Sequence, residues 1–367
     1  MKPCGDQIYF VLYSVLLALL LNSCDAEQAP YPLLDSGFGA SKERVAWLDE
    51  HRVLFYGYGG QKPQTQEDRK KQDWGIYIWD IGKNTVSKYA DARALQCYRD
   101  GRISYWVDTK IKSENGKKVE YYYWKSGEFG KEKAHVARWR DVKEGLPGLY
   151  RTLPCRAVPS PKEMQGKSWE PLLEGNGYLE YPSAMRDGRR VSMPAILHRP
   201  GKASVALPFS RYQIGGVRYY DFAHAYFTEI SYQYSNRQSP ESWTEDSCWP
   251  FWWFTPEGNS KEVCVPYGPW AEGASAGIVP AKAGLFIWSM NTAGSYGAGK
   301  AGGYLLKGGK WERVVVGPLW GPSVSPGGCV IAFAHAPHLA ATRVGHPGQR
   351  TVKAIDLCKL TQEVKHE

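Results

Sequence analysis

Two short glycine-rich patterns in the sequence contain residues that could do chemistry. The first, Gly273 to Gly277, has the G-x-S-x-G spacing that presents a nucleophilic serine, here Ser275, on a sharp turn between a strand and a helix. No helical segment follows, so we interpret it as the start of a β-strand. The second, residues 294–301, differs by one residue from a phosphate-binding loop, because Ala301 stands where a hydroxyl would bind Mg²⁺. We interpret its glycines as part of a connection between two strands.

A group of histidines is the third candidate. His335 and His338 have the H-x-x-H spacing of two metal ligands on one helix, and His346 follows. Pro337 between the first two favours a loop over a helix, and no third ligand is evident. We therefore expect a solvated loop here, with no metal site and no cofactor.

Acidic residues could support glycoside chemistry, which needs two carboxyl groups flanking the bond that is cleaved. Their spacing selects no pair, so an enzyme with carboxylates in a central channel is an alternative hypothesis and not the leading one. The candidates are Asp187, Asp221, Glu229, Glu245 and Asp246.

The aromatic run from Trp249 to Phe254 could bind a ligand or fill a core. Its residues alternate too little for a strand with one solvated face, so we expect a strand buried on both faces between neighbouring sheets. The alternative is a stacking platform for sugar rings or apolar peptide. The binding candidates for that alternative are Trp243, Trp252, Trp253 and Trp270.

Short strands separated by turn residues surround all of these patterns. Glycine (39), proline (24), tyrosine (24) and tryptophan (15) are abundant and helix-forming runs are few, which favours β structure. Residues 44–89 contain four predicted strands, and comparable groups recur at intervals close to the 40 to 50 residues of a propeller blade. Only the third group, around residues 145–209, is irregular. We predict an all-β chain in which residues 41–367 form a single six-bladed β-propeller.

The last group of strands carries a resemblance to a known repeat. Val324 to Phe333, with the sequence VSPGGCVIAF, precedes Val352 to Leu357, with the sequence VKAIDL, and Gly75 to Ile81 matches the second half of the same pattern. This pattern resembles the repeat of TolB-type six-bladed propellers, although Gly327 replaces the usual Asp. The resemblance implies a blade structure and no particular activity.

The N-terminus has the properties of an export signal. Ile8 to Leu21 is an uncharged apolar run that is shorter than the ~20 residues of a membrane-spanning helix. The residues that follow, Leu21 to Cys24, are similar to the lipobox of bacterial lipoproteins, in which the cysteine carries lipid; an ordinary secretory signal is the alternative. We predict a signal peptide at 1–23, a palmitate-type anchor on Cys24 and a tether at 24–40. The expected location is the periplasmic side of a bacterial cell envelope, at the inner or outer membrane.

Six cysteines remain after the signal peptide and the lipid site are set aside, and an even number in an exported protein indicates disulfides. Cys248 and Cys264 fall almost opposite each other in a hairpin that turns at 255–258, and Cys329 and Cys358 flank two strands that could pair. Elimination leaves Cys97 and Cys155 as the third pair.

The net charge of +9 favours an anionic partner, although a charge of this size also serves solubility alone. An exported protein rarely meets nucleic acid, so we exclude that partner. The leading hypothesis is a non-catalytic scaffold that binds a protein or an envelope polymer through long polar loops. The predicted loops are Gln61 to Asp73, Lys110 to Lys118 and Ala293 to Gly302.

Overall fold

In its described part, the structure of the chain, a computed structural model, consists almost entirely of antiparallel strands. No helix in its described part is long and apolar enough to cross a membrane. The residues that it describes are 31–40, 45–59, 67, 72–99, 101–138, 167–172, 177–210, 216–229, 248–266, 275–290, 301–336 and 350–363.

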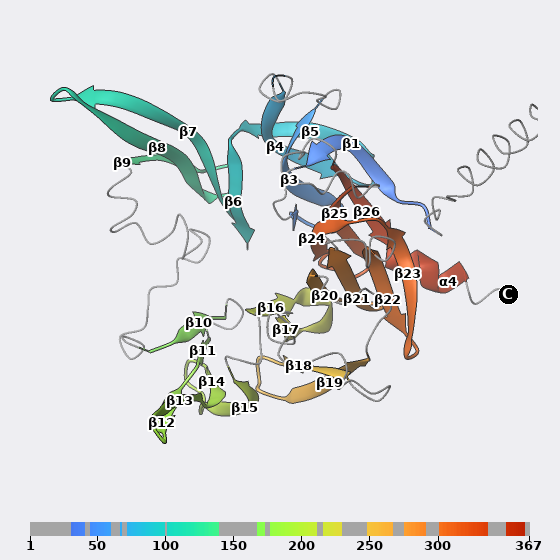
Figure 1. Cartoon of the computed structure of the whole chain (residues 1–367). Helices are drawn as coiled ribbons and strands as arrows, with labels where there is room; N and C mark the ends of the chain where they lie inside the picture. Colours follow the sequence, from blue (N-terminus) through green and yellow to red (C-terminus); the bar gives the residue numbers. More distant parts are fainter. Residues whose placement is uncertain are drawn as a thin grey trace, which may run out of the picture.

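The described strands form one eight-stranded sheet, four four-stranded sheets and one two-stranded hairpin. We divide the eight-stranded sheet into two halves, so that six units of four strands follow one another around the molecule (Figure 1). The first two units are consecutive hairpins. Unit 1 contains β2 (Ala46–Trp47), β3 (Arg52–Gly59), β4 (Asp73–Asp80) and β5 (Thr85–Asp91). Unit 2 contains β6 (Ala94–Arg99), β7 (Arg102–Glu114), β8 (Lys117–Glu128) and β9 (Lys133–Arg138).

Unit 3 carries an insertion between its second and third strands. Its sheet has the order β10 (Trp169–Pro171), β11 (Tyr178–Glu180), β14 (Pro194–His198) and β15 (Val205–Ser210). A separate hairpin, β12 (Ser183–Arg186) with β13 (Arg189–Ser192), connects the two middle strands.

Units 4 and 5 return to the simple order. Unit 4 contains β16 (Gly216–Tyr220), β17 (Ala225–Glu229), β18 (Cys248–Phe254) and β19 (Ser260–Pro266), with a 3-10 turn at Asp221–Ala223. Unit 5 contains β20 (Ser275–Ala281), β21 (Gly284–Met290), β22 (Gly302–Lys307) and β23 (Lys310–Val316).

Unit 6 combines strands from both ends of the sequence. It contains β24 (Leu319–Val324), β25 (Val330–His335), β26 (Thr351–Asp356) and β1 (Leu34–Ala40), and helix α4 (Leu357–Glu363) follows β26. Leu34 pairs with Ala354 in β26, while Gly39 pairs with both Thr351 in β26 and Tyr58 in β3. The expected tether at 24–40 is therefore wrong for residues 34–40, because their backbone groups complete the ladder between units 6 and 1.

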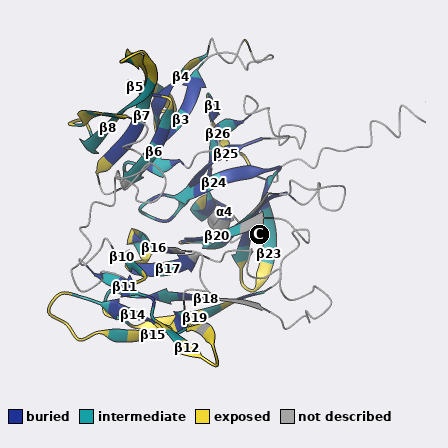
Figure 2. Ribbon diagram, turned by 60° about the vertical axis from the view of Figure 1, so that its left-hand side comes forward, coloured by how far each residue is buried: buried dark blue, intermediate teal, exposed yellow. Residues whose placement is uncertain are grey.

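Apolar side chains between neighbouring units form the core. In β3 the side chains of Val53, Leu54 and Phe55 are each 1% exposed or less. The strand is buried on both faces because a neighbouring sheet lies on each side of it. Five clusters of buried residues join unit 2 to unit 1, unit 1 to unit 6, unit 6 to unit 5, unit 5 to unit 4, and unit 4 to unit 3. Among the described residues no such cluster joins unit 2 to unit 3. Figure 2 shows the buried residues within the sheets and the exposed ones at hairpin tips.

One predicted disulfide is present with both partners described. Val330 in β25 pairs with Asp356 in β26, and the flanking Cys329 and Cys358 are bonded across the two strands, with their Cα atoms 5.1 Å apart. Cys329 to Cys358 is therefore confirmed as a pair.

Cys97 and Cys264 are also disulfide-bonded. Cys155 lies outside the described residues, and Cys248 lies on β18 without a described side chain. The β18–β19 hairpin turns as expected, but Cys248 lies opposite Pro266 and Cys264 opposite Pro250, so the two cysteines are diagonal neighbours. The pairings Cys248 with Cys264 and Cys97 with Cys155 stay predictions.

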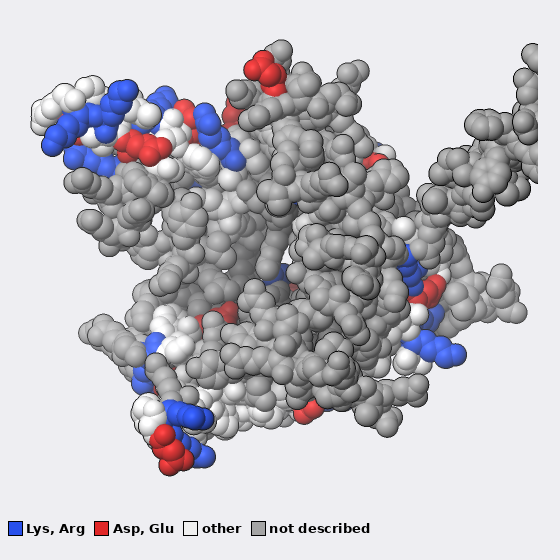
Figure 3. Space-filling view, in the orientation of Figure 1, with Lys and Arg blue, Asp and Glu red and all other residues white. Residues whose placement is uncertain are grey.

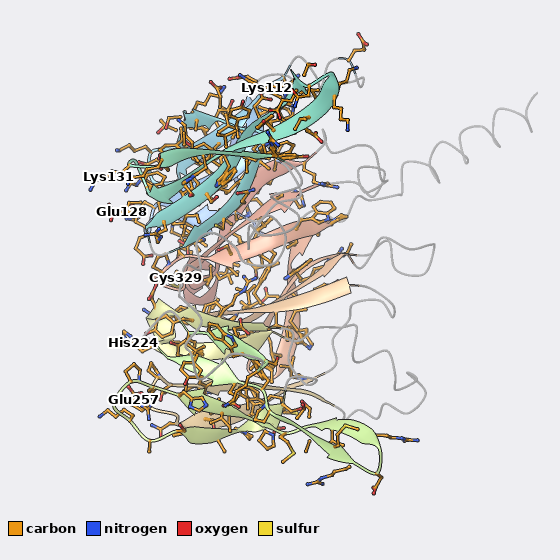
Figure 4. The ribbon with its side chains drawn as sticks, turned by 90° about the vertical axis from the view of Figure 1, so that its left-hand side faces the viewer. Lys112, Glu128, Lys131, His224, Glu257 and Cys329 are labelled. Carbon is orange, nitrogen blue, oxygen red and sulfur yellow. A yellow bond between two sulfur atoms is a disulfide. The ribbon has the colours of Figure 1, made fainter. Side chains whose placement is uncertain are left out.

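The connections within the units lie on two sides of the molecule. Within an antiparallel unit, the first and third connections leave at one end and the second leaves at the other. Turns of the first kind hold Lys131, His224, Glu257 and Cys329, and Glu128 ends the strand before one of them. Figure 4 labels these residues along one side, hereafter the turn face. Among the described second connections, the β7–β8 hairpin and the β12–β13 insertion lie at the opposite end of their units, hereafter the loop face.

Candidate binding surface

The β7–β8 hairpin of unit 2 extends away from the sheets as an arm (Figure 1). The two strands pair without interruption from Asp108 opposite Tyr123 to Glu114 opposite Lys117. The turn is Asn115-Gly116, and both residues have positive φ, 51° and 76°, as a type I′ turn requires. The predicted loop at Lys110 to Lys118 is therefore wrong, because this turn and the cross-strand pairs continue the hairpin to its tip.

One face of the arm alternates lysine and tyrosine. The Nζ atom of Lys110 lies 5.3 Å from the centre of the Tyr123 ring, and that of Lys112 lies 5.0 Å from the centre of the Tyr121 ring. Arg138 on β9 donates from Nε to the Tyr121 hydroxyl at 3.1 Å and pairs through Nη2 with Glu114 at 2.6 Å. These contacts fix the tyrosine rings while the ammonium groups stay in solvent.

The opposite face of the arm carries stacked aromatic rings. Trp106 stacks on Tyr122 with ring centres 5.8 Å apart, and Trp124 stacks on His135 with centres 5.2 Å apart. The Trp106 indole donates to the carbonyl of Asp108 at 2.8 Å, which holds its ring in place. Since all four rings are only half-buried, they offer a rigid apolar surface.

The distal half of the arm combines exposed aliphatic groups with lysines that have no ion-pair partner among the described residues. Ile111 is 67% exposed, and Val136 on the adjoining strand β9 is 54% exposed, which is unusual for aliphatic side chains. In the described part of the chain, no carboxylate pairs with the four exposed lysines of this region, which are Lys110, Lys112, Lys117 and Lys118. Figure 3 shows the resulting cluster of basic side chains on the arm.

The β12–β13 hairpin of unit 3 repeats this combination. Its turn is Asp187-Gly188, again with positive φ at both residues, 49° and 71°. Met185 is 68% exposed and Val191 is 37% exposed, and Arg186 pairs opposite Arg189 next to the turn. Two basic, partly apolar hairpins therefore extend from the same class of connection.

The predicted tryptophan candidates have different positions. Trp252 is only 4% exposed, between units 3 and 4, where it packs against Phe209, so it cannot be a free stacking platform. Trp253 is half-buried and stacks on Phe227 with ring centres 6.4 Å apart. Trp243 and Trp270 lie outside the described residues, as does Cys24.

Ser275 and His335, from the serine-hydrolase and metal-ligand patterns, both lie on strands. Ser275 is the first residue of β20, opposite Met290, so the G-x-S-x-G segment enters a strand and no helix. His335 is buried at the end of β25, which makes the expected solvated loop wrong at this residue; its Nε2 lies 2.8 Å from the Val316 carbonyl. Burial lowers the pKa of His335 to about 4.

The remaining motif residues lie partly outside the described residues. His338, His346 and residues 291–300 lie outside the described part, and within that part no group of three potential metal ligands occurs. Asp187 and Asp221 are both exposed but lie on different units. Asp187 is at the tip of the β12–β13 hairpin, and Asp221 is in the β16–β17 turn. Glu229 ends β17 without a described side chain, and Glu245 and Asp246 lie outside the described residues.

Comparison with known proteins identifies no relative. No protein-family model and no curated protein matches the chain. Among solved structures, it is similar to the β-propeller domain of the Trilobed protease from Pyrococcus furiosus, at 8% identity over 80% of this chain and 77% of that chain, with a TM-score of 0.28. It is also similar to MPT-4, a mannose phosphorylase from Leishmania mexicana, at 10% identity over 75% and 89% of the two chains, with a TM-score of 0.23. Neither likeness identifies a function.

Proposed function

We propose that the chain is an exported, lipid-anchored six-bladed β-propeller that acts as a binding scaffold for an anionic polymer of the bacterial envelope. The six units correspond to the blades. Two observations support this arrangement: five apolar clusters join the units in order, and β1 closes unit 6 with a strand from the other end of the sequence.

The arm of unit 2 is the observation that carries the binding function. Its exposed lysines supply charge complementary to an anionic polymer, and its rigid rings supply flat surfaces for sugars. The lysines follow the hairpin from Lys110 to its tip, and the rings lie nearer its base, where β6 and β9 complete the sheet. A surface of this kind binds extended ligands without enclosing them.

A matched pair of charge reversals tests this assignment. Lys110→Glu with Lys112→Glu changes the arm, and Lys131→Glu with Lys133→Glu makes the same charge change on the same sheet towards the turn face. Dextran sulfate, with neutral dextran as a control, serves as the polymer probe in a surface-binding assay.

We expect the arm variant to bind dextran sulfate about tenfold or more weakly, a loss of about 1.4 kcal/mol, and binding to weaken with salt. The control variant should bind like the wild type. Equal losses in both variants would show a response to net charge alone, and unchanged binding in the arm variant would remove the arm from the function.

The lipid anchor is tested separately. Cells that express the full chain and are fed labelled palmitate should incorporate the label, and Cys24→Ala should abolish incorporation. Labelling that persists in Cys24→Ala would contradict the anchor while leaving the binding assay unaffected.

A further inference from the structure

A hydrogen-bonded chain of side chains in unit 3 has the order nucleophile, base and carboxylate. The Ser204 hydroxyl lies 2.9 Å from Nδ1 of His198, and Nε2 of His198 lies 3.0 Å from Oε2 of Glu180. Lys167 approaches the other oxygen of Glu180 at 3.0 Å. These distances are those of a serine activated by an imidazole that a carboxylate orients.

Three neighbouring strands bring the groups together. Tyr178 in β11 lies directly opposite His198 in β14, which places Glu180 diagonally across from His198 on the same face of the sheet. The short connection 199–204 then reverses direction at Gly201, where φ is 65°, and presents Ser204 immediately before β15. The imidazole of His198 stacks on the Tyr178 ring with ring centres 4.6 Å apart, and this contact fixes the orientation of the imidazole.

The protonation pattern follows from the donors and acceptors. An ionised carboxylate only accepts hydrogen bonds, so Nε2 of His198 carries the proton that faces Glu180. In the neutral imidazole, Nδ1 is then unprotonated and accepts from the Ser204 hydroxyl, which is the arrangement that a general base needs.

The exposed fraction of the side chains falls from the serine through the histidine to the carboxylate. Ser204 is exposed, the His198 side chain is 21% exposed, and the Glu180 side chain is 12% exposed. A substrate can therefore reach the hydroxyl, while the carboxylate is partly shielded from water. Because Ser204 lies in a connection between third and fourth strands, it belongs to the turn face, on the other side from the proposed binding arm.

We propose that Ser204 is a nucleophile for acyl transfer from small carboxylic esters. Its Oγ attacks the ester carbonyl as its proton passes to Nδ1 of His198; the acyl carbon–Oγ bond forms, the bond to the alcohol oxygen breaks, and the proton leaves with the alcohol. Water then attacks the acyl-serine, gives a proton to Nδ1, and the carboxylic acid departs as Ser204 regains its proton. Glu180 stays ionised throughout and orients His198, so it is a positioning residue.

A second serine–histidine pair in the same chain provides a comparison, in which the serine is half-buried and not exposed as Ser204 is. Ser126 lies 3.0 Å from Nε2 of His135, a distance close to that at Ser204. No carboxylate in the described part of the chain contacts the His135 ring, which stacks on Trp124 instead. Ser126 therefore has the base without the carboxylate that orients it.

The experiment labels the folded, full-length protein with a fluorophosphonate ester and maps the adducts by peptide mass spectrometry. We expect the adduct on Ser204 and not on Ser126 in the same sample, and loss of that adduct in Ser204→Ala. His198→Gln should slow labelling about 100-fold or more, the usual contribution of a general base. Glu180→Gln should slow it at least about tenfold while a circular dichroism spectrum shows the fold intact.

Two labelling results would overturn the proposal. An unlabelled Ser204 in the wild type, or equal labelling of Ser204 and Ser126, removes the special reactivity without any variant. Labelling of Ser204 that is unchanged in His198→Gln or Glu180→Gln shows that exposure alone directs the reagent.

Discussion

Replacing Cys329 and Cys358 together by alanine should lower the free energy of unfolding by about 3–4 kcal/mol. The disulfide closes a loop with a sequence separation of 29 residues. In the chain-entropy treatment, a loop of about that length removes about 12 cal/mol/K from the unfolded ensemble, which corresponds to about 3.6 kcal/mol at room temperature. Both side chains are half-buried, so alanine adds only a small loss of packing.

The disulfide also holds the part of unit 6 that receives β1. It joins the start of β25 to the start of α4, and β26 between them pairs with β1. Loosening this connection should therefore weaken the junction between units 6 and 1. Trp47 reports on that junction, because its indole donates to the Ser323 carbonyl at 2.8 Å.

Urea unfolding at equilibrium, followed by tryptophan fluorescence, measures the effect. Wild type and double variant are compared first under oxidising conditions, where Cys97 and Cys264 keep their disulfides in both proteins. They are then compared in reductant, where the difference between them should disappear. Equal stability under oxidising conditions would refute the loop-entropy argument, and a difference that persists in reductant would assign the loss to packing.

Two further substitutions test the core between units. His335 has a pKa of about 4 in the folded state against an ordinary value of about 6.5. The free energy of unfolding of the wild type should therefore fall by roughly 3 kcal/mol as pH falls from 6.5 to 4. Unfolding measured as a function of pH should show that His335→Gln lacks this part of the acid sensitivity. Acid sensitivity that is identical in the variant would show that His335 does not titrate on unfolding. Gly39→Ala should cost about 1–3 kcal/mol in thermal unfolding, since its Cβ would lie 2.0 Å from Cζ of Tyr58. An unchanged transition would mean that β1 is not tightly paired.

Much of the strand pattern could be predicted from local signals. The Gly75 to Asp80 and Trp249 to Phe254 segments are apolar runs bounded by turn residues, and both form strands. The Asn115-Gly116 turn carried an equally clear hairpin signal, and following it would have extended β7 and β8 to their observed ends.

Other elements have no local signal of their own. Leu34–Ala40, with the sequence LDSGFGA, contains two glycines and a polar pair, so its strand depends on β26 and β3 on either side. Trp252 and Trp253 are adjacent in sequence and both aromatic, yet one is 4% exposed and the other only half-buried. The neighbouring unit decides that difference, because it covers one face of β18 more closely than the other.

The sequence by itself determined the β class, the turn positions that local residues impose, and the Cys329–Cys358 pair that flanks two alternating strands. The tertiary structure alone decided that β1 joins unit 6, that His335 is buried, and that the predicted loop on unit 2 is an arm. It also decided that Glu180, His198 and Ser204 meet. The physical reason is that strand ladders and side-chain networks join residues far apart in the chain, and register, not composition, sets which of them face each other.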